Sequence, residues 1–367
     1  MAKHNAANAR IKREYLQYLK EAMRRDESSI DAVAKALARF EDANGHKDFK
    51  NFHREQAVAF KRKLDEQTAV HTGKPLSRAT VHSTLSALRA FFLWLAGQPG
   101  YKSRLRYADA DYFNLTDKEV RIAKAVHIKP FPTLDQVHHV LGTMPSGTDI
   151  ELRNRALVAF ALLTGARDGA LASFQLKHVD LVQGRVDQDA RDVRTKASKT
   201  FSTWFFPVGG DALAIVEGWC QHLRAKLLWG DSDPLFPATQ VGLGESGGFV
   251  PVGLRRDGWH GAGPIRDIFR AAFTNAGLPY FKPHSFRDTL VQLGEQTCPT
   301  IEAFKAWSQN LGHERVMTTL TSYAPLAPHR QAELIRGMGA PPAADAVDPA
   351  YVAKVMAAMR QVGSGRL

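Results

Sequence analysis

Apolar side chains recur at helical spacing through the first third of the chain, and this periodicity restricts what that part can fold into. The strongest run follows Ser77, a residue type that caps helices, and ends at Gly97, a residue type that terminates them. The apolar side of this predicted helix carries Val81, Leu85, Leu88, Phe91, Phe92 and Leu95. Similar patterns predict helices over residues 10–25, 28–40 (with its leading serines as candidate caps) and 54–67. Four such helices form a small all-α bundle.

Basic residues are concentrated in the same third. The chain of 367 residues has 49 Lys and Arg against 37 Asp and Glu, a formal net charge of +12, and residues 1–125 hold 24 of the basic and 15 of the acidic residues. A basic domain beside a nearly neutral one is typical of nucleic-acid binding, although a solubilising surface has the same excess. The polar faces of the bundle carry the candidates for contact with a phosphate backbone, with a solvated helix face as the alternative: Lys61, Arg62, Lys63, Arg78, His82 and Arg89.

Length and composition restrict the class of protein further. A chain of 367 residues exceeds the size of most single cores, so two domains are expected. Cys220 and Cys298 are the only cysteines, which excludes a disulfide scaffold and suits a reducing cytosol. The longest apolar run, residues 156–163, is too short to cross a bilayer, and the polar N-terminus lacks the apolar stretch of a signal peptide. We therefore expect a soluble cytoplasmic protein with an anionic partner and no membrane association.

The pattern changes after the bundle. Residues 98–130 are polar and weakly periodic, which predicts a linker, and the prolines at its end place a domain boundary near residue 126. A mostly helical domain that also contains short strands is expected over residues 126–340, followed by a tail over 341–367. Its helices are predicted over residues 133–143, 150–164, 211–228, 264–276, 285–297, 300–309, 314–322 and 328–336, and its strands near 184–186, 192–195 and 200–208. The 8 glycines of residues 241–263 predict a mobile loop.

Two short motifs place a charged group at the start of a helix. Gly165 ends one predicted helix and Arg167 begins the next, where free N–H groups and the helix dipole join the guanidinium in a seat for an anion. His284 and Arg287 are three residues apart at another helix start, so that one can exchange a proton while the other binds a phosphate. Each motif taken alone is better explained as an ordinary surface turn.

Two further signals involve a histidine, a tyrosine and a lysine. Leu311-Gly312-His313 is followed ten residues later by Tyr323. A helix cap and a half-buried core residue are the plainer interpretation of this pair. Lys199 begins an aromatic-rich strand, from which its ammonium can reach over a bound backbone; an edge-strand charge is the alternative.

Together, in this order and spacing, the four signals resemble the tyrosine recombinase family, also called phage integrases. Residues 164–174 are similar to the family's first box, residues 283–289 to its second and residues 311–323 to its third. Residues 77–95 are similar to the last helix of the family's N-terminal core-binding domain. The resemblance covers nearly the whole chain. It implies a mainly α fold, with a four-helix, SAM-like DNA-binding bundle and a mixed α+β, mostly helical catalytic domain that contains a small antiparallel sheet.

The resemblance also implies a role for each matching residue. The catalytic candidates are Arg167, Lys199, His284, Arg287, His313 and Tyr323. The arginines match the pair that holds the scissile phosphate, the histidines match those beside it, and the tyrosine matches the nucleophile. Lys196 and Lys199 are both candidates for the family's lysine; Lys199 is preferred because it precedes Pro207 by the spacing typical of the family.

Two positions depart from the family pattern. Ala170 stands where an acidic residue commonly follows the first arginine, and Asp168 faces elsewhere on a helix, so we expect another group to support Arg167. The spacing between His313 and the tyrosine is one residue longer than usual, which places Ser322 at the common position. Tyr323 is preferred as the nucleophile because a phenol is the matching group.

The implied reaction is cleavage and rejoining of duplex DNA through a 3′-phosphotyrosine, which conserves the energy of the phosphodiester and requires no cofactor and no metal. A tyrosine with a pKa of about 10 needs a base, which the resemblance assigns to His284. The arginines and His313 would stabilise the charge on phosphorus, and Lys199 would protonate the leaving oxygen. The two domains are expected to clamp double-stranded DNA, and four protomers to act on two duplexes. The tail after residue 340 is either a helix exchanged between protomers or a frayed end.

Three alternative functions use the same residues differently. A type IB topoisomerase-like enzyme would relax DNA without exchanging partners, and a catalytically silent DNA-binding protein would keep the fold alone. A metal-dependent hydrolase built on His284 and His313 lacks a suitably spaced acidic ligand in the sequence.

Overall fold

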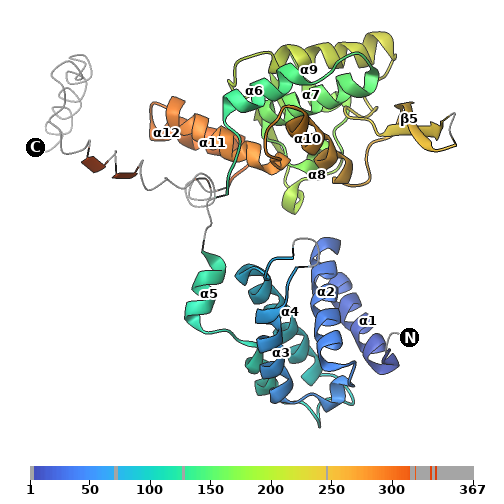
Figure 1. The fold of residues 1–367 in the computed structure, drawn as a ribbon, viewed down its shortest axis with the longest axis vertical. Helices are drawn as coiled ribbons and strands as arrows, with labels where there is room; N and C mark the ends of the chain where they lie inside the picture. Colours follow the sequence, from blue (N-terminus) through green and yellow to red (C-terminus); the bar gives the residue numbers. More distant parts are fainter. Residues whose placement is uncertain are drawn as a thin grey trace, which may run out of the picture. The chain divides into compact units, whose positions relative to one another are not determined.

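The computed structural model describes residues 4–69, 73–125, 129–244 and 247–314, together with residues 319, 331–332 and 335–336. The chain divides into two compact units, Met1–His127 and Ile128–Leu367 (Figure 1). Among the helices of the described residues, none has the length and apolar character needed to span a membrane.

The first unit is built of helices that begin at local capping signals. Its described helices are α1 (Ala6–Glu21), α2 (Glu27–Asn44), η1 (Phe49–Asn51), α3 (Arg54–Glu66), α4 (Arg78–Ala96), η2 (Tyr107–Phe113) and α5 (Asp117–Lys124). The Ser77 side chain accepts the N–H of Thr80 at the start of α4, and Gly97 follows its last residue. The expected serine cap of α2 is wrong. Asp26 precedes both serines, and its carboxylate accepts the Ser29 N–H at 2.7 Å.

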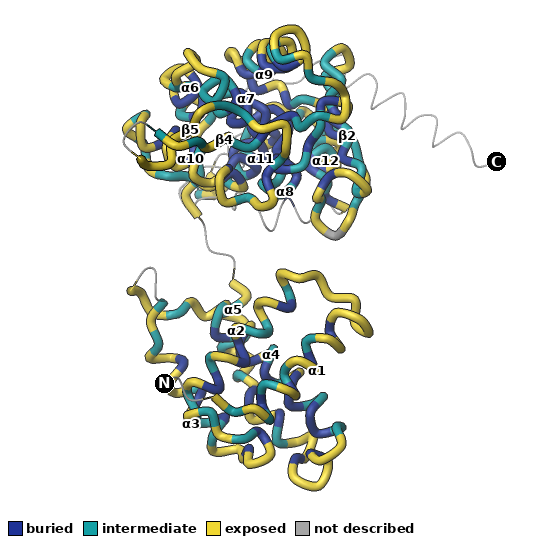
Figure 2. The backbone as a smooth tube through the Cα atoms, turned by 90° about the vertical axis from the view of Figure 1, so that its right-hand side faces the viewer, coloured by how far each residue is buried: buried dark blue, intermediate teal, exposed yellow. Residues whose placement is uncertain are grey.

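An aromatic core joins α2, α3, α4 and η2. The ring of Phe40 is fully buried and meets the rings of Phe60, Phe92 and Phe113 edge-on, with centroid separations of 5.2, 5.5 and 5.6 Å. Figure 2 colours the buried residues of these helices dark blue. The first unit therefore has a hydrophobic core of its own.

Residues 98–115 belong to the first unit and do not form the expected linker. The 3-10 helix η2 packs against α4, and Tyr101, Leu105 and Phe113 are buried in the aromatic core. These apolar residues are separated by turns and a 3-10 helix, so they carry neither the helical nor the strand period that marks an element in sequence. A capping box between Thr116 and Glu119 then begins α5.

The second unit packs around α7. Its described helices are α6 (Leu134–Thr143), α7 (Asp149–Thr164), α8 (Asp168–Leu171), α9 (Ala212–Gln221), α10 (Gly263–Asn275), α11 (Phe286–Thr297) and α12 (Ile301–Asn310), and a π-helical turn over His222–Lys226 continues α9. Every residue from Ala156 to Thr164 is buried, so this part of α7 has no solvent-facing side. The neighbouring helices α6, α9 and α11 contact it (Figure 1).

A small antiparallel sheet lies in this unit, in the order β1 (Val179–Asp180), β2 (Arg185–Gln188) and β3 (Phe201–Trp204). Val186 of β2 pairs with Val179 on one side and with Thr203 on the other. The strand expected over residues 192–195 is wrong, and the expected third strand ends at Trp204 and not at residue 208. Residues 192–195 form a loop because the Val193 N–H binds the carbonyl of Asp189 at 2.7 Å and not a neighbouring strand.

The glycine-rich segment expected as a mobile loop instead contains a β-hairpin. Strand β4 (Thr239–Leu243) pairs with β5 (Phe249–Leu254) in antiparallel register. Buried Arg153 of α7 anchors its base: the guanidinium donates to the Pro237 carbonyl at 2.5 Å and to Thr239 Oγ1 at 3.0 Å, and it lies over the Trp259 ring. Apolar residues between the glycines form the strands, so the glycine count alone was misleading.

Candidate active site

Arg287 joins three segments that are far apart in the chain. It lies in the first turn of α11, directly after the 3-10 helix η6 (Pro283–Ser285), and only 2% of the residue is exposed. Its Nη1 donates to the Gly165 carbonyl at 2.7 Å, and its Nη2 donates to the Leu311 carbonyl at 2.5 Å and to His313 Nε2 at 2.8 Å. The first, second and third boxes therefore meet at this guanidinium.

Arg167 lies at the N-cap of α8, where the chain turns after α7. Gly165 makes the turn with a φ of +58°, which side chains rarely adopt, and a Cβ at this residue would lie 2.9 Å from Leu311 and 3.0 Å from Leu290, so a larger residue would be strained and would displace these side chains. The Arg167 side chain is half-buried, and no hydrogen bond or ion pair involves it within the described part of the chain. Such a guanidinium can accept an anionic ligand.

The start of α8 is fixed by a residue outside the three boxes. Arg266 of α10 donates to the Asp168 carboxylate through Nε at 2.9 Å and Nη2 at 2.5 Å. Ala170, the departure from the family pattern, is buried. Asp168 thus supports the helix start through Arg266 without contacting Arg167 itself.

Both predicted histidines lie in a positive environment. Burial, followed by the charges of Arg287 and Arg167, lowers the pKa of His284 to about 4. The same causes, with His284 and Lys199 after them, lower the pKa of His313 to about 3. Both imidazoles are therefore neutral at pH 7, and both lie close enough to Arg287 and Arg167 for these charges to lower their pKa values.

Hydrogen bonds assign the tautomer of His313. Its Nε2 accepts from Arg287, because a guanidinium can only donate, so the proton of the neutral ring is on Nδ1. Nδ1 lies 2.7 Å from Thr319 Oγ1, which is 2.6 Å from Ser308 Oγ. All three residues are buried, so this chain of polar contacts fixes the ring orientation.

Of the two candidate lysines, the structure brings Lys199 to the histidines. Lys199 Nζ pairs with Glu314, the residue after His313, at 2.5 Å, and its charge contributes to the lowered pKa of His313. Lys196 is exposed in the 3-10 helix η4 (Lys196–Ser198), and no hydrogen bond or ion pair within the described residues involves its side chain.

Some expected features lie outside the described residues. These are Tyr323, its alternative Ser322, the predicted helix over 314–322 apart from residues 314 and 319, most of the helix over 328–336, and the tail over 341–367. Within the described residues, no cluster of three or more His, Cys, Asp and Glu side chains could hold a metal ion.

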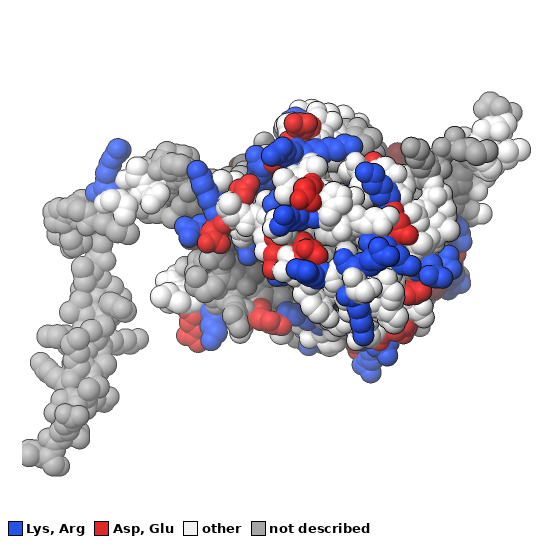
Figure 3. Space-filling model, turned by 90° about the horizontal axis from the view of Figure 1, so that it is seen from below, with Lys and Arg blue, Asp and Glu red and all other residues white. Residues whose placement is uncertain are grey.

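The predicted DNA-binding residues of the first unit differ in their contacts. Arg78 pairs with Asp65 at 2.5 Å and Arg89 with Asp111 at 2.8 Å, while Lys61 Nζ donates to the Asn114 carbonyl at 3.1 Å. Arg62 and Lys63 are exposed on α3, and His82 is half-buried on α4. Figure 3 shows that basic side chains are interspersed with acidic ones on the face it draws.

Comparison with known proteins places this architecture in one class. Residues 13–98 match the family model of the phage integrase N-terminal SAM-like domain. The tyrosine recombinase XerC of Lactobacillus delbrueckii subsp. bulgaricus is 26% identical over 252 residues, which cover 68% of this chain and 72% of XerC. XerC of Escherichia coli is 28% identical over 170 residues, which cover 46% of this chain and 49% of that protein.

Solved structures share the fold at low sequence identity. A lambda integrase dimer bound to a COC′ core site has a TM-score of 0.57 at 14% identity, covering 85% of this chain and 93% of that one. The Tn1549 transposon integrase in complex with transposon right end DNA has a TM-score of 0.58 at 14% identity, covering 91% and 100%. A helical SAM-like unit followed by a mostly helical unit with small antiparallel sheets is the integrase-type recombinase architecture. These matches support placing the chain in the tyrosine recombinase family.

Sequence reasoning assigned no role to several residues around the site. Glu314, Arg266 and Thr319 contact the predicted site residues or their neighbours, as described above. Nothing in the local sequence separates an arginine such as Arg266 from other surface arginines. Its partner, Asp168, is 98 positions away, so only the packing of α10 beside α8 identifies it.

Proposed function

We propose that this chain is a site-specific DNA recombinase that cuts and rejoins duplex DNA through a 3′-phosphotyrosine intermediate on Tyr323. The observation that carries the proposal is the position of Arg287, whose guanidinium binds main-chain groups of the first and third boxes and the ring of His313. Arg167 follows Gly165 by two residues, and the charges of Arg287 and Arg167 act on both His284 and His313, which supports a shared site. Guanidinium and imidazole groups of this kind suit a phosphodiester in its transition state.

The reaction is a pair of transesterifications. The Tyr323 oxygen attacks the scissile phosphorus, the P–O bond to the 5′ oxygen breaks, and the DNA 3′ phosphate becomes esterified to the phenol. A 5′ hydroxyl, from the partner duplex in strand exchange, then attacks the same phosphorus and releases the phenol. Each step forms one P–O bond and breaks another, so no cofactor is consumed.

The neutral state of His284 fits the role of proton acceptor for the phenol. Burial and two arginines hold its pKa at about 4 in the DNA-free protein, which makes the ring a weak base. A bound phosphate brings negative charge beside Arg167 and Arg287, and this charge raises the pKa of the ring toward its ordinary value. Substrate binding and base strength are therefore linked.

Lys199 is the proposed general acid. Its ammonium must supply a proton to the leaving 5′ oxygen, so the Lys199–Glu314 contact has to open when DNA binds. Glu314 is largely exposed, with 74% of its side chain accessible, and can turn toward solvent.

The partner of the protein is proposed to be double-stranded DNA, with four protomers acting on two recombination sites. The basic first unit would bind the phosphate backbone through Arg62 and Lys63, which are exposed, and through Lys61, Arg78, His82 and Arg89 after exchange of their present contacts. The tail after residue 340 would pass to a neighbouring protomer.

A suicide substrate tests the proposal. The native chain is incubated with a nicked duplex from a candidate attachment site, and covalent protein–DNA adducts are separated on denaturing gels. We expect an adduct with the native chain and with Ser322→Ala, and none with Tyr323→Phe. Absence of a native adduct on a site that the protein binds specifically would favour a silent binding protein. Loss of the adduct in Ser322→Ala alone would make Ser322 the nucleophile in place of Tyr323.

A second assay incubates the native chain with a supercoiled plasmid that carries the site. Relaxation of the plasmid without joint products between two DNA molecules would indicate a topoisomerase.

A further inference from the structure

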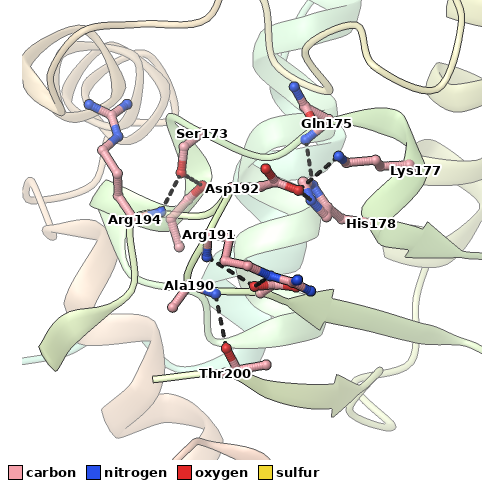
Figure 4. A network of polar contacts seen from close by, with 11 residues as sticks. Ser173, Gln175, Lys177, His178, Ala190, Arg191, Asp192, Arg194 and Thr200 are labelled. Carbon is pink, nitrogen blue, oxygen red and sulfur yellow. Dashed lines mark hydrogen bonds and ion pairs between the residues drawn. The ribbon is translucent and has the colours of Figure 1, made fainter. Parts of the chain in front are cut away.

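The loop between β2 and β3 carries Lys199 and is held by side chains outside the predicted catalytic set (Figure 4). The loop begins at Asp189, makes a turn at Val193 and returns to β3 at Thr200. Val193 is buried in the core of the second unit, with 1% of the residue exposed. The loop is therefore packed against the domain although its ends belong to a short sheet.

Arg194 forms the strongest external attachment of this loop. Its Nη1 donates to the His260 carbonyl at 2.6 Å, and its Nη2 donates to the Trp259 carbonyl at 2.5 Å and to the Ala172 carbonyl at 3.0 Å. The backbone N–H of Arg194 also donates to Ser173 Oγ at 2.9 Å. One residue thus joins the loop to two other segments.

These contacts connect the loop to the turn that carries Arg167. Ser173 Oγ donates to the carbonyls of Gly169 and Ala170 in α8, the helix that Arg167 begins. A Cβ on Gly169 would lie only 3.4 Å from the Arg194 carbonyl, so the loop passes closely over α8. A displacement of the loop relative to α8 would separate the predicted general acid from the predicted phosphate ligand.

A second attachment lies two residues earlier. Asp192 pairs with Lys177 Nζ at 2.8 Å and lies 3.6 Å from Nε2 of buried His178. The Gln175 N–H donates to His178 Nδ1 at 2.9 Å, so the neutral ring carries its proton on Nε2, on the side of Asp192 (Figure 4). The loop is therefore fixed at residues 192 and 194 from two directions.

Internal hydrogen bonds transmit this attachment to Lys199. Thr195 Oγ1 donates to the Lys199 carbonyl at 2.7 Å, and the Ser198 N–H donates to the Thr195 carbonyl at 3.3 Å. On the other side, the Ala190 N–H donates to Thr200 Oγ1 at 3.1 Å. The segment from Thr195 to Thr200 is closed on itself, so the orientation of Arg194 determines where the Lys199 backbone lies.

We propose that Arg194 is a positioning residue that fixes the β2–β3 loop on α8 and thereby holds Lys199 beside the scissile phosphate. This inference rests on the proposed function, because a general acid is needed only if a leaving oxygen is expelled. A direct contact of Arg194 with a DNA phosphate is the competing role. Three of the five guanidinium N–H groups of Arg194 already donate to carbonyls of the protein. This use of its donors favours the positioning role over a phosphate contact.

The leaving group distinguishes the two roles. In a duplex whose scissile 5′ oxygen is replaced by sulfur, the leaving thiolate needs no proton, so loss of a general acid no longer slows cleavage. Lys199→Ala is the reference variant. Arg194→Ala is the test, and Asp192→Asn is a second, milder variant that keeps the Arg194 contacts. Arg191→Ala is the matched control, because Arg191 belongs to the same loop and its guanidinium contacts Asp189 within that loop.

Single-turnover adduct formation is measured for each variant on the oxygen and the sulfur duplex. We expect Lys199→Ala to cleave the oxygen duplex about 100- to 10,000-fold more slowly than the native chain and Arg194→Ala to lose part of this factor, while both cleave the sulfur duplex at a rate within about threefold of the native chain. Asp192→Asn should show a smaller defect with the same rescue. Arg191→Ala should match the native chain on both duplexes.

Other outcomes overturn the proposal. An equal loss on both duplexes in Arg194→Ala, accompanied by weaker DNA binding, would make Arg194 a phosphate contact. Failure of sulfur to rescue Lys199→Ala would remove the general acid that Arg194 is proposed to position. If Arg194→Ala does not fold, lack of sulfur rescue in Asp192→Asn decides against the proposal. Absence of a native adduct on both duplexes would remove the inference together with the proposed function.

Discussion

Replacement of Arg287 by methionine tests whether this side chain holds the candidate site together. The guanidinium supplies hydrogen bonds to the carbonyls of Gly165 and Leu311 and to His313 Nε2, and the residue is 2% exposed. A buried acceptor left without its donor costs about 1–3 kcal/mol, so three such acceptors cost about 3–9 kcal/mol. Methionine fills much of the same volume. It also removes the cost of burying a cation, and this gain of several kcal/mol offsets part of the lost hydrogen bonding. We expect the free energy of unfolding to fall by about 2 kcal/mol.

Urea unfolding of the full chain, followed by tryptophan fluorescence, measures this change. Of the 6 tryptophans, Trp94 alone lies in the first unit, so the signal reports mainly on the second. Arg256→Met is the matched control, because Arg256 binds Asp233 with two hydrogen bonds at 2.7 and 2.6 Å but has 60% of its side chain exposed. Its loss should lower the free energy of unfolding much less, because exposed ion pairs contribute little to stability. Equal losses in the two variants would refute the role given to Arg287.

Three further predictions concern other parts of the chain. The neutral His313 keeps a pKa of about 3 in the folded state against 6.5 unfolded, so its contribution to stability is complete above pH 6.5 and is lost as the pH falls toward 3. The native chain should therefore lose about 1–2 kcal/mol more than His313→Gln between pH 7.5 and pH 5 in urea titrations, and parallel losses would contradict this. Gly312 has a φ of +73° and its Cβ would lie 2.7 Å from the Phe201 ring, whereas Gly277 has a φ of +72° in open space. Gly277→Ala should cost about 1 kcal/mol of unfolding free energy and Gly312→Ala at least about 1 kcal/mol more, and equal costs would dismiss the close contact. Arg62→Ala should lower the slope of log affinity for DNA against log salt concentration by about 0.9 in anisotropy titrations, and an unchanged slope would remove Arg62 from the interface.

Local signals predicted the helices of the first unit well, because helical period and capping depend on residues within a few positions of one another. The helix after Ser77 begins and ends where the sequence indicates. The same reasoning failed for residues 98–115, whose buried Tyr101 and Phe113 reach the core through turns and a 3-10 helix. It also failed for the β4–β5 hairpin, because glycines that indicated a loop are tolerated in a two-stranded hairpin.

The candidate residues of the second unit were found by their resemblance to a family, and the structure adds how they are held. The resemblance predicts that Arg287 binds phosphate. The structure adds that its guanidinium donates to the carbonyls of Gly165 and Leu311. Sequence left Lys196 and Lys199 as alternatives, and the contact with Glu314 favours Lys199. No short-range pattern contains this information, because Arg287 lies 122 positions from Gly165 and 24 positions from Leu311 in the sequence.

The sequence by itself determined the helical character and the basic charge of the first unit, because both depend on composition and on spacing within one or two turns of a helix. It indicated the candidate site residues only through their resemblance to a family. Tertiary structure alone decided that Arg287 is a buried junction, that Arg194 and Asp192 hold the loop of Lys199, and that both histidines are neutral. Each of these depends on burial and on contacts between distant segments, and both arise only when the helices pack around α7.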